Sequence, residues 1–178
     1  MSQVFLRRLS RWQAEDQRDD FADLQSVAYR GTPQEATYDR DEFLRRFADH
    51  VQQPEFEMII ASNPALVGCS YGFRVDRDST WWDGFQDIPE HIEQLTASQH
   101  VFCLAELMVL PEERRHHVGG KLHDQVLSRS GAPVAITLLE PGDVPARTAF
   151  QAWGWTKTGQ LHRRSDATPL EAWIRQAP

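Results

Sequence analysis

Cysteine is scarce in this sequence, which has two, Cys69 and Cys103, among its 178 residues. Both stand in apolar stretches, so we expect two buried, reduced thiols, with a disulfide or a reactive thiol as the alternatives. Their spacing is not that of a pair of metal ligands. Redox chemistry is therefore not the expected function.

Long apolar runs are missing as well. The longest has five residues, 101–105, whereas a membrane-spanning helix needs roughly 18 and the core of a signal peptide about 7–15. We therefore expect no membrane partner and a cytoplasmic location. Internal repeats and low-complexity segments are also lacking, which argues against a solenoid or a disordered tail.

Positive charge is in deficit, since 19 Lys and Arg face 26 Asp and Glu, for a net charge of −7. This balance argues against nucleic acid or an anionic membrane as the main partner. Much of the negative charge lies between residues 76 and 93, which hold six acids and one base. Such a rim would attract a cationic ligand, although a solvated surface is the alternative.

The residues that are present predict one α/β domain spanning 1–178, because 40% of them are hydrophobic and the length suits one core. Strict alternation over 67–75 predicts a half-buried strand, and the spacing of Phe43, Phe47 and Val51 predicts a helix. Strands are expected at 4–9, 58–61, 67–75, 101–110, 134–139, 155–161 and 170–174, and helices around 21–28, 39–51, 118–130 and 145–153. Residues 76–100, with a short helix at 89–95, form an expected insertion. This order predicts a mixed sheet covered by helices.

A polar loop joins the strand at 101–110, expected to be buried on both faces, to the helix that starts near Val118. The first amides of a helix lack intrahelical partners and lie at the positive end of its dipole, which suits a phosphate. Basic residues and glycines of the kind that such a site uses occur here: Arg114, Arg115, Gly119, Gly120 and Lys121. An ordinary connection with exposed basic residues is the alternative.

Three other motifs are rejected. Lys121 is followed by leucine, so the hydroxyl that a Walker A loop needs is missing. The G-x-S-x-G match at 68–72 lies in a strand whose alternation continues, so it is not a nucleophile elbow. His116, His117 and His123 are not spaced as metal ligands, so we expect no metal and histidines that face solvent or phosphate.

Three segments together resemble the GNAT superfamily of acetyl-CoA-dependent N-acetyltransferases: ELMVLP at 106–111, RRHHVG at 114–119 with Leu122, and AFQAWGW at 149–155. The resemblance implies a central mixed, mostly antiparallel sheet of about seven strands flanked by about four helices, with the insertion at about 76–100. It also implies acyl-CoA as the cofactor and direct attack by an acceptor amine, without a covalent enzyme intermediate.

The resemblance assigns residues to the cofactor. Backbone groups of the strand would pair with the pantetheine arm, and the loop amides would bind the pyrophosphate. The implied cofactor-binding residues are Leu107, Met108, Val109, Arg114, Arg115, His116, His117, Val118, Gly119, Gly120, Asp143 and Phe150.

The chemistry needs a base for the acceptor ammonium, a donor for the oxyanion and an acid for the leaving thiolate. Glu106 is the candidate base, with a structural carboxylate as the alternative, and an amide near Val109 is the candidate oxyanion donor. Phe150 stands where many family members have the tyrosine acid, although a thiol with a reference pKa near 8.5 leaves readily without one. His117 replaces a usual glycine and requires a permissive backbone angle, and Asp143 replaces an asparagine.

The sequence thus predicts an enzyme that transfers an acetyl or other acyl group to the amine of a small cationic acceptor in a ternary complex. The alternative is a non-catalytic relative that binds acyl-CoA as a sensor or interaction protein. Trp81, Trp82 and Tyr71 are the expected acceptor-side residues, and the two tryptophans could instead anchor the insertion. The sequence leaves a homodimer open.

Overall fold

The computed structural model describes residues 3–32, 35–36, 38–76, 79–86, 89–97, 101–162 and 169–177. The chain forms two compact units. The first unit comprises Met1–Phe73 and Ala105–Gly131, and the second comprises Arg74–Leu104 and Ala132–Pro178. Strand β5 (Val101–Val109) contributes its first four residues to the second unit and the others to the first. That the whole chain acts as a single domain stays a prediction.

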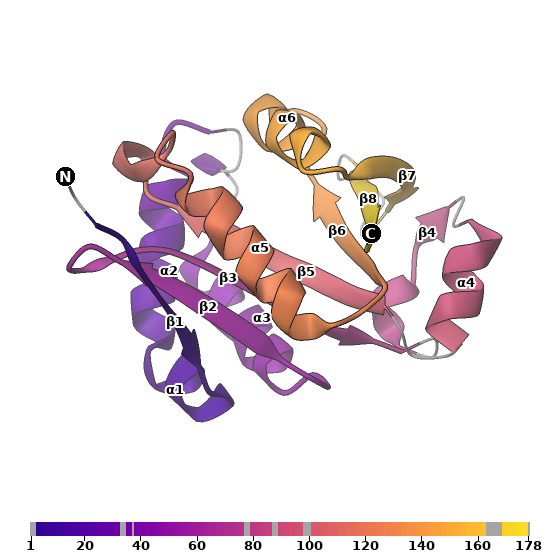
Figure 1. Ribbon diagram of the computed structural model, residues 1–178, viewed down its shortest axis with the longest axis horizontal. Coiled ribbons are helices and arrows are strands. Elements are labelled where there is room, and N and C mark those ends of the chain that lie inside the picture. The colour runs from indigo at the N-terminus through magenta and orange to yellow at the C-terminus, as the bar shows by residue number, and fades with distance from the viewer. Residues whose placement is uncertain are drawn as a thin grey trace. The chain divides into compact units, whose positions relative to one another are not determined.

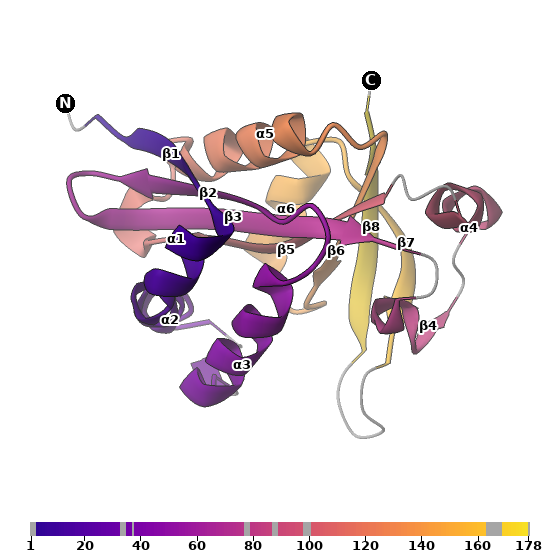
Figure 2. The same ribbon diagram turned by 90° about the horizontal axis from the view of Figure 1, so that it is seen from below.

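The first unit is a sheet covered on both faces. Its strands are β1 (Phe5–Leu9), β2 (Glu57–Ser62), β3 (Leu66–Val75) and the end of β5, in the order β1-β2-β3-β5, with β1–β2 and β2–β3 antiparallel. Its helices are α1 (Arg11–Asp16), α2 (Arg18–Ala28), α3 (Arg40–Val51) and α5 (Val118–Ser130), with the short 3-10 helix η3 (Pro111–Glu113) before α5. Figure 2 shows α5 on one side of β1–β3 and α1–α3 on the other.

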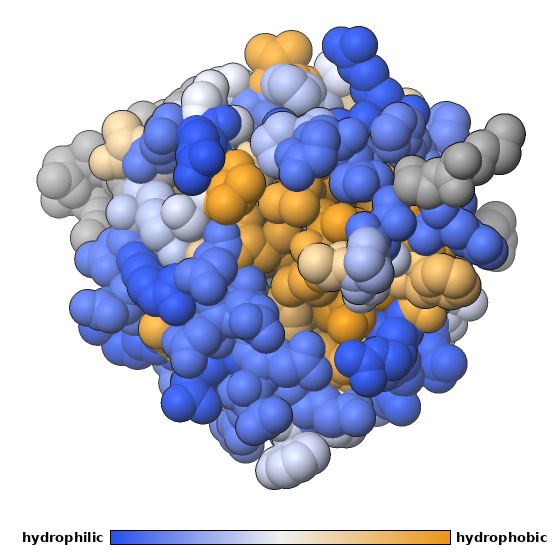
Figure 3. Space-filling model, turned by 90° about the vertical axis from the view of Figure 1, so that its left-hand side faces the viewer, coloured by the Kyte–Doolittle hydropathy of each residue, from blue (hydrophilic) through white to orange (hydrophobic). Residues whose placement is uncertain are grey.

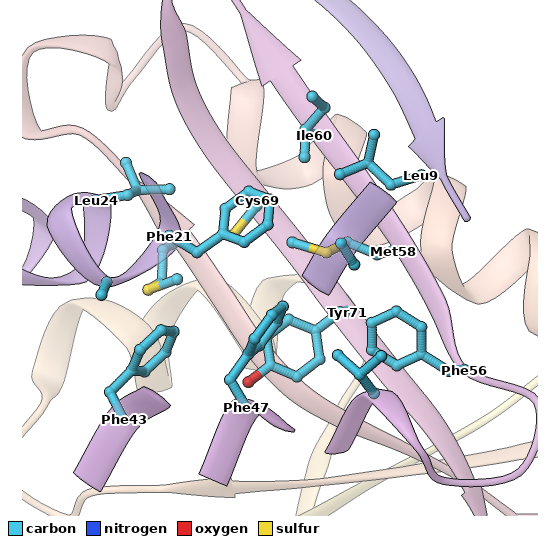
Figure 4. Packing of buried hydrophobic residues seen from close by; sticks show 14 of the residues in the cluster. Leu9, Phe21, Leu24, Phe43, Phe47, Phe56, Met58, Ile60, Cys69 and Tyr71 are labelled. Atoms are coloured by element: carbon cyan, nitrogen blue, oxygen red, sulfur yellow. The ribbon is translucent and has the colours of Figure 1, made fainter. Parts of the chain in front are cut away.

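The core of the first unit lies between the sheet and α1–α3. Aromatic rings dominate it: Phe47 stacks on Phe43 at 5.8 Å and meets the edge of Tyr71 at 5.2 Å, centroid to centroid. Figure 4 shows these rings packed with aliphatic and sulfur-containing side chains from β1, β2 and β3. Burial of each large side chain contributes about 1.5–3 kcal/mol to folding, so this cluster fixes α2 and α3 against the sheet.

Side-chain caps fix where the helices of the first unit begin. Asp39 accepts hydrogen bonds from the amides of Asp41 and Glu42 at 2.9 and 3.2 Å, which starts α3 where its pattern predicts. Helix α1 was not among the expected elements. Its signal is the capping box between Ser10 and Gln13, in which each side chain accepts from the backbone amide of the other, at 3.1 and 2.9 Å.

The second unit contains the inserted segment and the end of the chain. The insertion holds the 3-10 helix η2 (Thr80–Trp82), β4 (Phe85–Gln86) and α4 (Glu90–Ala97), and β6 (Val134–Leu139), α6 (Val144–Ala152), β7 (Thr156–Leu161) and β8 (Leu170–Gln176) follow. The strand order is β5-β6-β8-β7-β4, with β5–β6 parallel and the pairs β6–β8, β8–β7 and β7–β4 antiparallel. Figure 1 shows β6 and α6 in this part of the chain.

The predicted fold class, a mixed and mostly antiparallel α/β arrangement, is confirmed. All seven predicted strands are present, and the eighth, β4, lies in the insertion. The described residues form six α-helices: the four expected, α4 in the insertion, and α1. Within the same residues no helix has the length and apolar character needed to cross a membrane.

Two predictions of burial were wrong. Strand β3 is buried on both faces from Val67 to Phe73 rather than half-buried, because α5 covers the face that carries Gly68. Conversely, β5 is fully buried only over its first four residues and at Met108, and Leu110 lies beyond its end. The partly open stretch is where Glu106 lies.

Candidate active site

The loop after β5 has an unusual backbone at two positions. Arg115 and His117 adopt left-handed conformations with φ of 74° and 61°, although neither is glycine. His117 is the N-cap of α5 and makes no side-chain capping hydrogen bond. The amides of Val118, Gly119 and Gly120 precede the first intrahelical bond, which Lys121 N donates to His117 O at 3.0 Å. These three amides have no partner within the helix, and that they bind an anion stays a prediction.

The charged side chains of this loop divide into two groups. Arg114 is a structural anchor, because its guanidinium donates to the carbonyl of Val109 at 3.3 Å and to the carbonyl of Ala28. His116 pairs with Glu113, Nδ1 to Oε2, at 3.5 Å. Arg115, His117 and Lys121 are exposed, as are Arg114 and His116. Arg115 and Lys121 are thus exposed cations within three residues of the first amides of α5.

Glu106 is the centre of a polar cluster built from three elements. Its Oε1 accepts hydrogen bonds from Gln25 Nε2 at 3.4 Å and from Arg46 Nη2 at 3.3 Å. Its Oε2 accepts from the hydroxyl of Tyr29 at 3.2 Å. Gln25 lies in α2 and Tyr29, four residues later, is the C-cap of that helix, and both side chains reach Glu106. About 10% of the Glu106 side chain is exposed, so the carboxylate is held in a largely enclosed place.

This environment changes the acidity of the cluster. Burial raises the pKa of the Glu106 carboxyl above its usual value, and the charge of Arg46 and the hydrogen bonds from Tyr29 and Arg46 only partly offset that effect. Burial lowers the pKa of the Arg46 guanidinium, but the charge of Glu106 leads the interactions that raise it above its usual value. A carboxylate with a raised pKa is a better proton acceptor near neutral pH, which suits a general base.

Tyr71 lies in the core of the same unit, on β3. Its side chain is fully buried, and its hydroxyl is 3.3 Å from Nδ1 of His50. Burial raises the pKa of Tyr71 well above its usual value, and the charge of Glu106 adds to this effect. The ring of Tyr71 packs against Phe47 and Phe56, and this role in the core is sufficient to explain why a tyrosine is buried here. Contact of Tyr71 with an acceptor molecule stays a prediction.

In the second unit, Phe150 and Asp143 both have structural roles. Phe150 is 5% exposed and packs against Trp153 and Trp155, with centroids at 5.3 and 5.2 Å. Asp143 is the N-cap of α6 and accepts a hydrogen bond from the amide of Ala146 at 3.2 Å. Contacts of either residue with acyl-CoA stay predictions.

The two insertion tryptophans contact each other edge to face, at 5.0 Å between centroids. Trp82 also donates from Nε1 to the carbonyl of Asp76 at 3.0 Å, which ties η2 to the end of β3. This bond supports the anchoring alternative for Trp82. Of the six acids in the segment, Asp78 and Asp87 lie outside the described residues.

The structure brings together residues that the sequence analysis did not. Glu106 was identified, but its partners Gln25, Tyr29 and Arg46 were not, nor was His50, whose Nδ1 lies 3.3 Å from the hydroxyl of Tyr71. Their signal is polar residues four apart on otherwise apolar helix faces, Gln25 with Tyr29 and Arg46 with His50. That signal is weak without the strand that the two helices face.

Several negative predictions can be compared with the structure. Cys69 and Cys103 are both buried and neither forms a disulfide, as expected. Residues 68–72 form part of β3 and not an elbow. Among the described residues no group of three His, Cys, Asp or Glu side chains could hold a metal ion. His123 was expected to face solvent or phosphate, and this was wrong: it is a fully buried residue of α5, and its Nδ1 lies 2.9 Å from Asp124 Oδ1.

Comparison with solved structures identifies the fold. PH1933 from Pyrococcus horikoshii has a TM-score of 0.68 at 13% identity, covering 99% of both chains. A GNAT-family acetyltransferase from Staphylococcus aureus has a TM-score of 0.64 at 13% identity, covering 98% of this chain and 99% of that one. PaiA N-acetyltransferase from Thermoplasma acidophilum, solved with coenzyme A, has a TM-score of 0.59 at 10% identity with the same coverage.

These likenesses show that the chain has the GNAT fold, as its motifs predict. No protein-family model and no curated protein matches the sequence.

Figure 1 shows α5 beginning on the left-hand side of the view, and Figure 3 looks onto that side. Hydrophobic residues gather near the centre of this surface and hydrophilic residues surround them.

Proposed function

We propose that this protein transfers an acyl group from acyl-CoA to the amine of a small acceptor, with Glu106 as the general base. The observation that carries the proposal is the enclosed carboxylate of Glu106, whose pKa is raised by burial. Glu106 directly precedes Leu107–Val109 on β5, the segment that resembles the pantetheine-binding strand of the GNAT family. Acyl-CoA supplies an activated thioester.

The donor side of the proposal rests on the start of α5. The uncapped amides of Val118, Gly119 and Gly120 and the exposed Arg115 and Lys121 suit a diphosphate. His117 occupies the left-handed conformation that a glycine would favour, so the departure at this position preserves the loop's geometry. Arg114 acts by holding the loop to β5 and α2.

In the proposed reaction, the chain's own residues accept a proton from the acceptor amine. An alkyl ammonium has a reference pKa near 10.4 and must lose a proton before its nitrogen can attack. A carboxylate offers about four acceptor positions, and the described residues fill two on Oε1 and one on Oε2 of Glu106. The remaining position on Oε2, beside Tyr29, is where an acceptor N–H would bind and be deprotonated.

The melting temperature tests the donor. We expect acetyl-CoA at 100 times its Kd to stabilise the protein by about 2.7 kcal/mol, whereas ATP and NAD have little effect. Gly119→Val should remove most of this stabilisation, because the new side chain blocks the loop amides, and Lys121→Ala should remove less. Each variant is first compared with the wild type without ligand. Equal stabilisation of the wild type and Gly119→Val would exclude the loop from the site.

Release of free thiol from acetyl-CoA in the presence of amines tests transfer. We expect at least one amine to raise thiol release well above hydrolysis. The alternative function, a non-catalytic acyl-CoA-binding protein, is favoured by the buried, aromatic surroundings of Phe150. It predicts binding without turnover for every amine and no gain from Phe150→Tyr.

A further inference from the structure

The candidate base is next to a cation that is itself partly open. Arg46 lies on α3, 36% of its side chain is exposed, and its guanidinium carbon lies 5.8 Å from the centroid of the Phe43 ring. Within the described part of the chain its hydrogen bond is made by Nη2, which donates to Glu106. A guanidinium has five N–H donors in a planar fork. Its remaining donors are therefore available on the exposed side.

This arrangement discriminates between kinds of amine. An ammonium that binds Glu106 comes within a few ångströms of Arg46, and like charges repel strongly in a partly enclosed place. The Glu106–Arg46 pair is already neutral, so a lone ammonium would leave the cluster with an excess positive charge. A carboxylate on the acceptor would restore neutrality and would satisfy the free edge of the guanidinium with strong, charge-assisted hydrogen bonds.

Resting on the proposed function, we propose that the acceptor is an amino acid, with its amine on Glu106 and its carboxylate on Arg46. Nη2 of Arg46 and Oε1 of Glu106 are 3.3 Å apart, so the two groups of the acceptor must also be close together. An α-amino acid, which carries both on one carbon, meets this demand better than a long diamine does. The four charges then alternate in sign.

Paired acceptors test this proposal. Each of several L-amino acids is compared with its decarboxylated amine, for example histidine with histamine, phenylalanine with phenethylamine and lysine with cadaverine, by thiol release from acetyl-CoA. Both members of a pair use Glu106, so effects on the base cancel in the ratio of their kcat/KM values. We expect the wild type to favour at least one amino acid over its amine.

Substitution of Arg46 then isolates its role. Arg46→Met should lower the amino acid to amine ratio about tenfold to a hundredfold, as expected for loss of a charge-assisted pair. Arg46→Lys keeps the charge but not the planar fork, so its loss should be smaller. Arg45→Met is the matched control, because Arg45 is the exposed neighbour on the same helix, and its ratio should stay unchanged.

The outcomes are distinguishable. A wild type that favours the amines without a carboxylate, or a ratio that Arg46→Met leaves unchanged, overturns the inference while acyl transfer stands. Absence of turnover with every acceptor overturns the proposed function and the inference with it. Calorimetric titration of the amino acids in the presence of coenzyme A adds a readout independent of turnover, in which Arg46→Met should weaken binding and Arg45→Met should not.

Discussion

Tyr29, the C-cap of α2, donates a hydrogen bond from its hydroxyl to Oε2 of Glu106 on β5 at 3.2 Å, and so joins residues that lie 77 positions apart in the chain. The bond stabilises the ionised carboxylate and partly offsets the effect of burial on the pKa of Glu106. The phenol thus contributes to how readily Glu106 accepts a proton.

The first prediction concerns the base itself. Glu106→Gln keeps the shape of the side chain but removes its proton affinity, so we expect kcat to fall about 10²–10⁴-fold. Binding of acetyl-CoA, measured by its effect on the melting temperature, should be retained. A kcat within a factor of two of the wild type would show that Glu106 is a structural carboxylate.

The second prediction concerns pH. Glu106 must be ionised to act as the base, so kcat/KM should fall as the pH drops through its pKa, which burial places above the usual value. Tyr29→Phe removes a bond that lowers this pKa. We therefore expect the acidic limb of the pH profile to move to higher pH, with the plateau above it largely kept.

Tyr38→Phe is the matched control for this shift. Its hydroxyl also donates a hydrogen bond within the first unit, to the carbonyl of Ala22 at 2.8 Å, and not to Glu106. Loss of that bond should cost about 0.5–1.5 kcal/mol of stability and leave the pH profile in place. If both variants moved the profile equally, Tyr29 would have no particular influence on Glu106.

The third prediction concerns the close approach of two strands. A Cβ at Gly68 would lie 2.9 Å from the carbonyl oxygen of Met108 and 3.2 Å from Cδ1 of Leu122. Gly68→Ala should therefore destabilise the protein by about 1–3 kcal/mol, because backbone and helix must both shift. Gly142→Ala meets nothing within 4 Å and should be nearly neutral. Denaturant unfolding of both variants measures the difference.

The fourth prediction separates two roles of Asp143. As the N-cap of α6 it accepts from the amide of Ala146 at 3.2 Å, so Asp143→Ala should cost about 0.5–2 kcal/mol of stability. Asparagine caps helices nearly as well, so Asp143→Asn should keep most of that stability. An altered acetyl-CoA affinity in the stable Asp143→Asn variant would reveal a separate contact with the cofactor.

The fifth prediction concerns the acid stability of the second unit. Burial raises the pKa of Glu171, but hydrogen bonds from Lys157 and Trp173 and the charges of Lys157 and Arg147 outweigh it, and the pKa lies below its usual value. Nζ of Lys157 and Nε of Arg147 lie 3.1 and 2.9 Å from the carboxylate. The folded state therefore binds the Glu171 proton more weakly than the unfolded state does.

It follows that the ionised Glu171 stabilises the fold above its unfolded pKa, and that this contribution is lost as the pH falls through the lower, folded pKa. Glu171→Gln should cost about 1–3 kcal/mol near neutral pH. The difference from the wild type should shrink as the solution is acidified. A difference that stays constant from neutral to strongly acid pH would contradict this account of Glu171.

Much of the fold could be predicted because its signals are local. The alternation in β3, the spacing of Phe43, Phe47 and Val51, and the left-handed cap at Gly131 all act within a few residues of each other. Helix α1 was not predicted, because its six residues are too few to show a helical period of hydrophobic residues. The burial of β3 on both faces was not predicted, because α5, the helix that covers its second face, lies some fifty residues further along the chain.

The sequence by itself determined the type and order of most helices and strands, because these depend on periodicity and on where glycine and proline stand, and its three motifs carried the resemblance to the GNAT family. That the loop before α5 binds a phosphate stays a prediction. Only the tertiary structure decided what surrounds Glu106. Hydrogen bonds and ion pairs between α2, α3 and β5 join residues up to 81 positions apart, and whether a buried carboxylate meets a phenol, an amide or a guanidinium depends on how those helices pack on the sheet.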